Sequence, residues 1–303
     1  MTIHKRLLVP LDGSELAETA FVYVRELAAR VGFEVVLLHV CDAVELGSIS
    51  QYRAYIERAV ETVRQQSEEL QKRTGTKGEQ IVVKGDVVVD YPAEGILRYA
   101  DEHNIGLILM ATHGRSGVKR WGLGSVADKV VRASKIPVCL VRGGASGEII
   151  HDKWPTRTIL VTLDGSELAE SVLLYVEALV RQTGVEAMQV LLLAVCEPVL
   201  LPAYYPSGIP LNWEDHMARI RRRDEEYLSK VEKKLRDAGL NVKSEVLVGK
   251  PAEEIVNYVS KNPVDFIAMS THGRSGVSRW VFGSVAEKVL LGVNRPILLI
   301  RPQ

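Results

Sequence analysis

Two nearly identical glycine-rich segments are the strongest candidates for binding a ligand. Residues 113–117 read HGRSG and are followed by Gly-Ser at 124–125, and residues 272–276 repeat HGRSG ahead of Gly-Ser at 283–284. Glycines let a backbone approach a ligand closely, while free amides and a hydroxyl at a helix start bind phosphate oxygens. The alternative is a flexible surface loop before a capped helix. The same spacing retained twice in one chain favours ligand binding.

The charge near these segments bears on which ligand they take. A helix N-terminus contributes about half a positive charge. A triphosphate therefore needs further cationic help, which Arg115, Arg274 or a metal ion such as Mg²⁺ would supply. His113 and His272 precede the glycines, but the sequence identifies no nucleophile or carboxylate partner for them. We therefore interpret both as structural histidines.

An aspartate follows the first apolar run of each half, Asp12 in VPLDGS and Asp164 in VTLDGS. In an open parallel sheet, ligands bind beyond the carboxyl ends of the strands, so groups after the first and fourth strands converge on one crevice. There Asp12 would accept a hydrogen bond from an adenine amino group or a ribose hydroxyl. Its alternative role is to cap the following helix. Val40 and Val195, at the ends of the second strands, either line a base pocket or belong to the core.

The chain is an internal duplication. Residues 7–18 and 159–170 agree at 10 of 12 positions, and residues 110–125 and 269–284 agree at 12 of 16. A length of 303 residues accommodates two domains of about 150 residues each. We expect one domain at 1–145, a linker at 146–156 and a second domain at 157–303, because glycines, a proline and polar residues interrupt the apolar pattern between the halves.

Composition excludes several classes of protein. Basic and acidic side chains are equal at 38 each, so no electrostatic excess recruits nucleic acid. No apolar stretch approaches the roughly 20 residues that a membrane helix requires, and we expect a cytoplasmic protein. Cys41, Cys139 and Cys196 stand singly in apolar runs, which predicts buried reduced thiols rather than disulfides or a metal cluster.

Short apolar runs alternate with longer helical periods in each half, which indicates βαβ units and a buried parallel sheet. In the first half we predict strands at 6–11, 34–41, 80–84, 106–111 and 137–141, with helices between them. Ser14 and Ser125 suit N-caps, and Pro92 suits the first turn of a helix. The second half repeats the pattern from 157 to 301, with a longer irregular loop at 197–215 as a plausible partner or lid surface.

With these residues in place, both halves resemble the universal stress protein family almost end to end. Its nucleotide-binding members carry a glycine, two residues, a second glycine, nine residues, and then glycine with Ser or Thr. The second glycine and the Gly-Ser pair match in both halves, whereas the first glycine is Ala111 in one half and Ser270 in the other. Thr162 also departs from its counterpart Pro10. If only one half binds, this turn favours the first.

The resemblance implies nucleotide-binding positions in both halves. In the first half they are Pro10, Leu11, Asp12, Val40, Met110, Ala111, His113, Gly114, Arg115, Gly117, Gly124, Ser125 and Val126. In the second half they are Thr162, Leu163, Asp164, Val195, Met269, Ser270, His272, Gly273, Arg274, Gly276, Gly283, Ser284 and Val285.

The resemblance also implies two tandem Rossmann-like α/β domains, each a doubly wound five-stranded parallel sheet of order 3-2-1-4-5. ATP, or else ADP or AMP, would bind between the first and fourth strands. Single-domain relatives pair through their last strands, so Pro137–Val141 and Pro296–Ile300 are expected to pair as an internal pseudo-dimer. Association of two chains into a homodimer is a further expectation that the sequence does not test.

Three functions remain open at this stage. The first is a nucleotide-dependent stress-response regulator that binds ATP without fast chemistry. The second is a slow ATPase or adenylyl-transferring enzyme, which the fold alone does not establish. The third is a scaffolding pseudo-dimer with empty sites, which the departures at Ala111 and Ser270 keep open.

Overall fold

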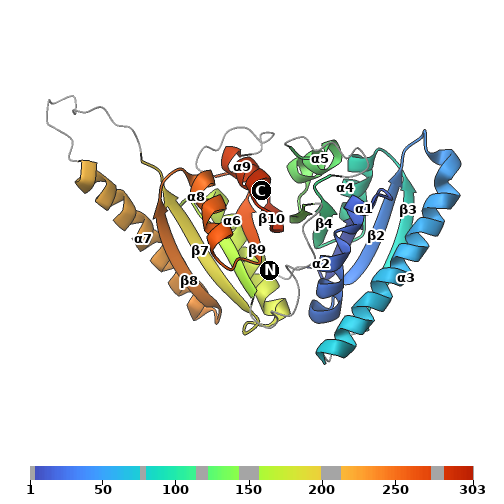
Figure 1. The fold of residues 1–303 in the computed structure, drawn as a ribbon, viewed down its shortest axis with the longest axis horizontal. Coiled ribbons are helices and arrows are strands. Elements are labelled where there is room, and N and C mark those ends of the chain that lie inside the picture. The colour runs from blue at the N-terminus through green and yellow to red at the C-terminus, as the bar shows by residue number, and fades with distance from the viewer. Residues whose placement is uncertain are drawn as a thin grey trace.

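The protein is built around one continuous ten-stranded sheet flanked by helices, in a computed structural model that describes residues 4–75, 80–113, 122–142, 157–198, 213–273 and 283–302. The strand order is β3-β2-β1-β4-β5-β10-β9-β6-β7-β8 (Figure 1). Each half therefore has the predicted order 3-2-1-4-5. Hydrogen bonding between β5 and β10 joins the two predicted five-stranded sheets into one.

The elements of the first half follow the predicted alternation. They are β1 (Arg6–Pro10), α1 (Glu15–Glu18), α2 (Phe21–Glu26), the π-helical η1 (Leu27–Val31), β2 (Glu34–Cys41), the 3₁₀ turn η2 (Leu46–Ser48), α3 (Ile49–Thr74), β3 (Val83–Val89), α4 (Pro92–Glu102), β4 (Leu107–Ala111), α5 (Ser125–Ala133) and β5 (Val138–Val141).

The second half repeats this order with one unbroken helix after its first strand. Its elements are β6 (Arg157–Thr162), α6 (Glu167–Thr183), β7 (Met188–Cys196), α7 (Trp213–Asp237), β8 (Asn241–Val248), α8 (Pro251–Lys261), β9 (Phe266–Ser270), α9 (Ser284–Gly292) and β10 (Ile297–Ile300).

The two halves meet through their last strands, as expected from the resemblance. β5 pairs antiparallel with β10, with Leu140 opposite Ile297 and Val138 opposite Leu299. All the other strand pairs are parallel. The short apolar edge of each half is thereby covered by the other half, which removes two exposed sheet edges.

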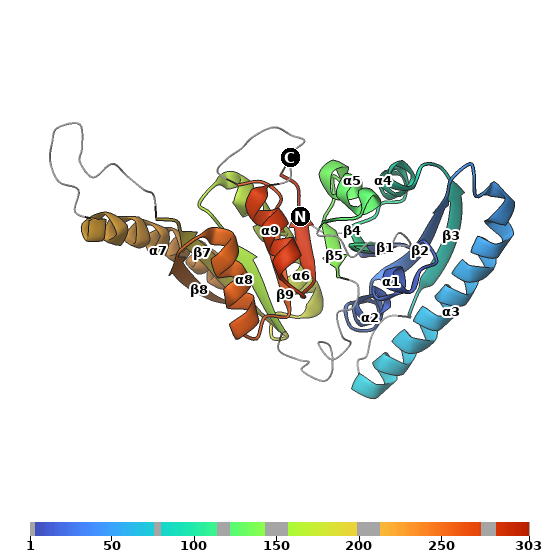
Figure 2. The same cartoon turned by 45° about the horizontal axis from the view of Figure 1, so that its top comes forward.

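Helices cover both faces of the sheet, and each face has a core that runs through both halves (Figures 1 and 2). Buried residues of α1, α2, α3, α6 and α7 pack on one face, and those of α4, α5, α8 and α9 pack on the other. The interior strands are buried on both sides, which explains their nearly continuous apolar sequences. No helix among the described residues is long and apolar enough to cross a membrane.

The third strand was predicted at the wrong residues. It runs from Val83 to Val89 rather than over 80–84, pairing Val35 with Val83 through Cys41 with Val89. The error arose because β3 is an edge strand, with exposed Lys84 and Asp86 interrupting the apolar pattern. Pairing with β2, rather than local hydrophobicity, sets its register.

Two smaller predictions are also corrected. Ser125 is the first residue of α5, and the N-cap is Gly124, whose extended backbone precedes the helix without a side-chain cap. The loop predicted over 197–215 is shorter, because α7 begins at Trp213 with two acidic residues in its first turn. Residues 199–212 and the predicted linker at 146–156 lie outside the described residues. Ser14 and Pro92 occupy their predicted helix-start positions.

Candidate functional site

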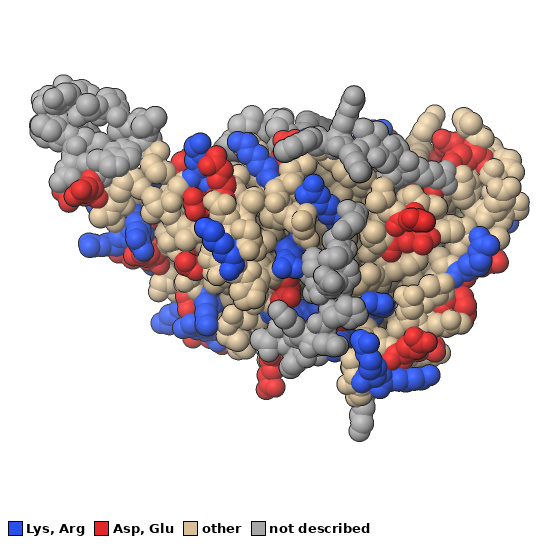
Figure 3. All heavy atoms as spheres, viewed as in Figure 1, with Lys and Arg blue, Asp and Glu red and all other residues tan. Residues whose placement is uncertain are grey.

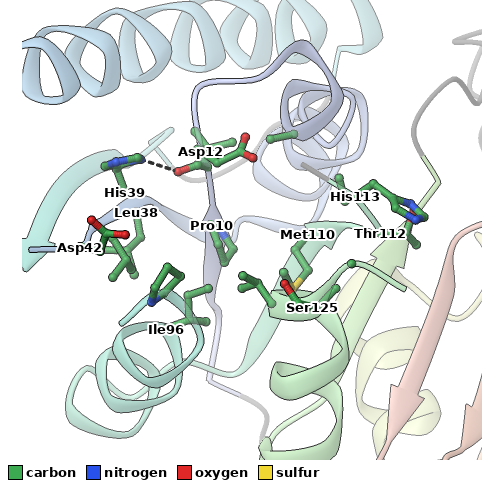
Figure 4. Close-up of a pocket in the computed structure, with 18 of the residues that line it drawn as sticks. Pro10, Asp12, Leu38, His39, Asp42, Ile96, Met110, Thr112, His113 and Ser125 are labelled. Atoms are coloured by element: carbon green, nitrogen blue, oxygen red, sulfur yellow. Dashed lines mark hydrogen bonds between the residues drawn. The ribbon is translucent and has the colours of Figure 1, made fainter. Parts of the chain in front are cut away.

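A crevice of about 300 Å³ opens at the carboxyl ends of β1, β2 and β4 in the first half. It lies where strand order reverses, between the first and fourth strands, as expected for an open α/β sheet. Figure 4 shows side chains from these strands and from α4 and α5 surrounding it. Its lining comprises Pro10, Leu11, Asp12, Ala17, Leu38, His39, Val40, Asp42, Glu45, Pro92, Ile96, Met110, Ala111, Thr112, His113, Gly124, Ser125, Val126 and Ala127.

Ten of these residues were predicted from the sequence, and the fold brings them together from four segments. Much of the lining is apolar, including Pro10 from β1, Val40 from β2 and Met110 from β4. Helix α4 closes on Val40, because a β-carbon at Gly95 would stand only 2.7 Å from the Cγ1 atom of Val40. This wall can receive a flat apolar group such as a nucleobase.

Asp12 holds the turn that precedes α1, but it is not the residue that caps this helix. Its Oδ1 atom accepts hydrogen bonds from the backbone N–H of Ser14 at 3.0 Å and from the Ser14 hydroxyl at 2.7 Å. Ser14 in turn caps α1 by accepting from the backbone N–H of Ala17 at 3.2 Å. The carboxylate also lines the crevice (Figure 4). Asp12 thus orders the turn at the edge of the crevice.

The N-terminus of α5 forms another part of the crevice lining. The backbone N–H of Gly124 donates to the carbonyl oxygen of Thr112 at 2.9 Å, which ties the helix start to the end of β4. A β-carbon on Gly124 would lie 3.1 Å from that oxygen, so glycine permits this close approach. Ser125 and Val126, in the first turn, line the crevice. First-turn amides and the positive end of a helix favour an anionic group.

In the second half, Asp164 and Ser166 form the same turn as Asp12 and Ser14 do in the first half. Asp164 accepts from the backbone N–H of Ser166 at 2.9 Å and from its hydroxyl. The Asp164 carboxylate lies directly against Gly273, where a β-carbon would collide with Oδ2. The N–H of Gly283 donates to the carbonyl of Thr271 at 2.9 Å, as its counterpart does in the first half.

Substitutions make the second half more polar at the corresponding strand ends. Thr162 replaces Pro10 and Ser270 replaces Ala111, and both hydroxyl-bearing residues are buried. The Ser270 Oγ atom accepts from the backbone N–H of His272 at 3.3 Å. The remaining predicted positions, Leu163, Val195, Met269, Ser284 and Val285, occupy the ends of β6, β7 and β9 and the start of α9.

Five predicted site residues lie outside the described part of the chain. They are Gly114, Arg115, Gly117, Arg274 and Gly276.

The family model described as the universal stress protein family matches twice, at residues 4–142 and 155–301. The chain belongs to the universal stress protein family.

Relatives agree with this family assignment. A universal stress protein of Methanocaldococcus jannaschii is 30% identical over 156 residues, which covers 52% of this chain and 85% of that protein. One from Synechocystis is 23% identical over 322 residues and covers 98% of this chain and all of its own length. The crystal structure of an Archaeoglobus fulgidus universal stress protein shares the fold, with a TM-score of 0.66, 23% identity and 98% coverage of both chains.

Sequence reasoning missed one group of polar crevice residues in the first half of this universal stress protein. The Nδ1 atom of His39 lies 2.8 Å from the carbonyl oxygen of Leu11, and its ring stacks on Tyr52 with centroids 3.9 Å apart. The Tyr52 hydroxyl donates to Glu45 at 2.8 Å, and Glu45 lines the crevice with Asp42. The second half has Ala194 where the first has His39. That difference between the repeats was the available signal.

The histidines before the glycine segments contact neighbouring hydroxyls. The Nδ1 atom of His113 lies 3.1 Å from the Thr112 hydroxyl, and that of His272 lies 2.9 Å from the Thr271 hydroxyl. These contacts fit the structural role that the sequence predicted. His113 also lines the crevice.

The three cysteines are free thiols. Burial raises the pKa of Cys139 to about 12. Burial together with a hydrogen bond to the Asp224 carboxylate raises the pKa of Cys196 to about 12, and burial raises the pKa of Cys41. All three are therefore protonated near neutral pH. Within the described ranges no group of three His, Cys, Asp or Glu side chains could hold a metal ion.

Proposed function

We propose that the first crevice binds an adenine nucleotide, with ATP as the expected ligand, and that the protein is a nucleotide-dependent stress-response regulator of the cytoplasm. One observation carries the proposal. The crevice combines apolar strand-end residues, suited to a base, with the N-terminus of α5, suited to phosphates. A site with both properties matches the two chemically different ends of a nucleotide.

The acceptor groups favour a base that carries an amino group. Asp12, Asp42 and Glu45 present carboxylates to the crevice. An ionised carboxylate only accepts hydrogen bonds, so it can pair with the exocyclic amine of adenine and not with a carbonyl at that position. This argument favours adenine over hypoxanthine in the same slot.

The same carboxylates indicate that a divalent cation accompanies the nucleotide. No lysine or arginine is among the described residues that line the crevice. A triphosphate beside three carboxylates is stabilised when a divalent cation accompanies it. We therefore propose that ATP binds with Mg²⁺, and that Arg115 supplies further positive charge.

The β5–β10 pairing supports the interpretation of the chain as an internal pseudo-dimer. It uses the strand edges through which single-domain relatives would associate with a second chain. We propose that a homodimer of this protein would use a different surface, since these two edges are already paired.

Nucleotide content tests the proposal directly. Denaturing the purified protein should release an adenine nucleotide, and chromatography of the supernatant identifies it as ATP, ADP or AMP. Added ATP and Mg²⁺ at about one hundred times the dissociation constant should stabilise the fold by about 2.7 kcal/mol. Absence of bound nucleotide, together with no thermal shift from any adenine nucleotide, would refute it.

Matched variants assign the binding to one half. Gly124→Val obstructs the start of α5, and Gly283→Val does the same for α9, because both glycines approach a carbonyl oxygen closely. We expect the Gly124 variant to lose the nucleotide-dependent shift and the Gly283 variant to retain most of it. Sustained phosphate release that only the Gly124 variant abolishes would instead support ATP hydrolysis.

A further inference from the structure

A second hollow lies between α1–α2 and α3, separate from the nucleotide crevice. It is a groove of about 520 Å³ that shares no lining residue with the crevice. One wall carries Glu18, Phe21 and Arg25, and the other carries Tyr55 and Arg58. Glu18 belongs to α1, Phe21 and Arg25 belong to one face of α2, and Tyr55 and Arg58 belong to one face of α3. Figures 1 and 2 show α2 and α3 side by side on one face of the sheet.

The groove carries an excess of positive charge. Among the residues that the structure describes, neither Arg25 nor Arg58 has an ion-pair partner. The one acidic side chain of the lining, Glu18, accepts a hydrogen bond from the Tyr55 hydroxyl at 3.0 Å. Two guanidinium groups therefore face a groove whose single carboxylate is already hydrogen-bonded.

Comparison of the halves shows that this charge is not a general feature of the repeat. The counterpart of Arg25 is Glu177, which pairs with Arg181 four residues later at 2.9 Å. The first half has Ala29 at the position of Arg181. Arg25 thus carries the opposite charge to Glu177, and the first half has no charged residue at the position of Arg181. The second half thus has a surface ion pair, Glu177–Arg181, where the first half has the half-buried Arg25 without an ion-pair partner among the described residues.

We propose that this groove is a binding site for a small organic anion with an apolar body, such as a phosphate monoester or a carboxylate. The guanidinium groups of Arg25 and Arg58 hold the anion, since arginine suits planar, two-point recognition of both groups. Phe21, the ring of Tyr55 and Ala59 provide the surface for the apolar body. Ala17 lines the crevice and Glu18 lines the groove, so α1 separates the two sites.

Ligand-observed ¹⁹F NMR of the full chain tests this assignment. ATP and Mg²⁺ are present in excess so that nucleotide crevices are occupied. The probes are 4-fluorophenyl phosphate, 4-fluorobenzoate and the uncharged 4-fluorobenzyl alcohol. We expect at least one anionic probe to bind at least tenfold more tightly than the alcohol. The tighter of the two anions identifies the site as selective for phosphate or for carboxylate.

Charge-reversal variants locate the binding. Arg25→Glu combined with Arg58→Glu should weaken the anionic probe at least tenfold. Arg53→Glu combined with Arg222→Glu, at exposed positions outside the groove, has the same net charge and should change affinity less than twofold. Circular dichroism checks that each variant is folded. The single variant Arg58→Gln, at an exposed site, provides a mild alternative with an expected loss of about threefold.

Three results would overturn the proposal. The first is that the anionic probes bind no better than the alcohol. The second is that the two double variants weaken binding equally. The third is that Arg58→Gln and the groove double variant bind the anionic probe as tightly as wild type does. The first result excludes an anion site, the second indicates nonspecific electrostatics, and the third places binding elsewhere.

Discussion

Gly95→Ala is the sharpest test of where the base would lie. Gly95 lies in α4 and contacts the crevice wall from behind. A β-carbon there would be 2.7 Å from Cγ1 and 3.3 Å from Cγ2 of Val40, and 3.0 Å from the β-carbon of Asp90. Carbon atoms in contact prefer about 3.5–4.0 Å. Val40 must therefore retreat by about 1 Å, and the crevice lies on its other side.

The free energies can be estimated from this geometry. Overpacking by one methyl group costs about 1–3 kcal/mol, and replacing glycine by alanine in a helix returns about 1 kcal/mol. The net loss of stability should thus be about 0–2 kcal/mol. If Val40 forms the base wall, its displacement should weaken ATP at least tenfold, which corresponds to about 1.4 kcal/mol.

Isothermal titration calorimetry with ATP and Mg²⁺, together with urea unfolding, separates the two effects. Glu254→Ala is the matched control, because Glu254 occupies the equivalent position of α8 and already has a β-carbon. It should leave the first-crevice dissociation constant unchanged. An ATP dissociation constant for Gly95→Ala within twofold of wild type would show that Val40 is not the wall against which the base packs.

Three further predictions concern individual side chains. Ser14→Ala removes the α1 cap and one partner of Asp12, so urea unfolding should show a loss of about 1 kcal/mol; an unchanged midpoint contradicts this. A hydrogen bond from Lys84 lowers the pKa of Glu34, so its stabilisation is present above the unfolded-state pKa and lost on acidification. The free energy of unfolding of wild type should exceed that of Glu34→Gln by about 0.2–1 kcal/mol at pH 7. The difference should vanish as the pH falls towards 3, and a difference that persists there would refute the assignment. Because burial raises the pKa of Cys139 to about 12, iodoacetamide at pH 8 should modify it only after unfolding, as peptide mass spectrometry would show.

Repeated local patterns explain why most of the fold was predictable. The two DGS turns each end a buried strand and begin a helix, and Ser14 caps α1 as expected. The second strand of the first half was predicted at its observed bounds, because Glu34–Cys41 is apolar at nearly every position. Local chemistry determines these elements, so their positions can be read without knowledge of their neighbours.

Predictions were weaker where distant contacts decide the outcome. β3 was misplaced because its register depends on pairing with β2. Gly124 rather than Ser125 caps α5 because its amide must reach the carbonyl of Thr112 at the end of β4. His39 and Glu45 were missed because neither belongs to a repeated motif. Their place in the crevice follows from the stacking of His39 on Tyr52.

The sequence by itself determined the duplication, the α/β class and the residues at the strand ends. These follow from hydrophobic period, turn residues and internal repetition, which are local properties of the chain, whereas the strand order within each half was implied by the family resemblance. The tertiary structure decided that α4 closes on Val40 and that Arg25 and Arg58 face one groove. Such features depend on which surfaces meet after folding, and contacts between residues distant in sequence leave no periodic signal.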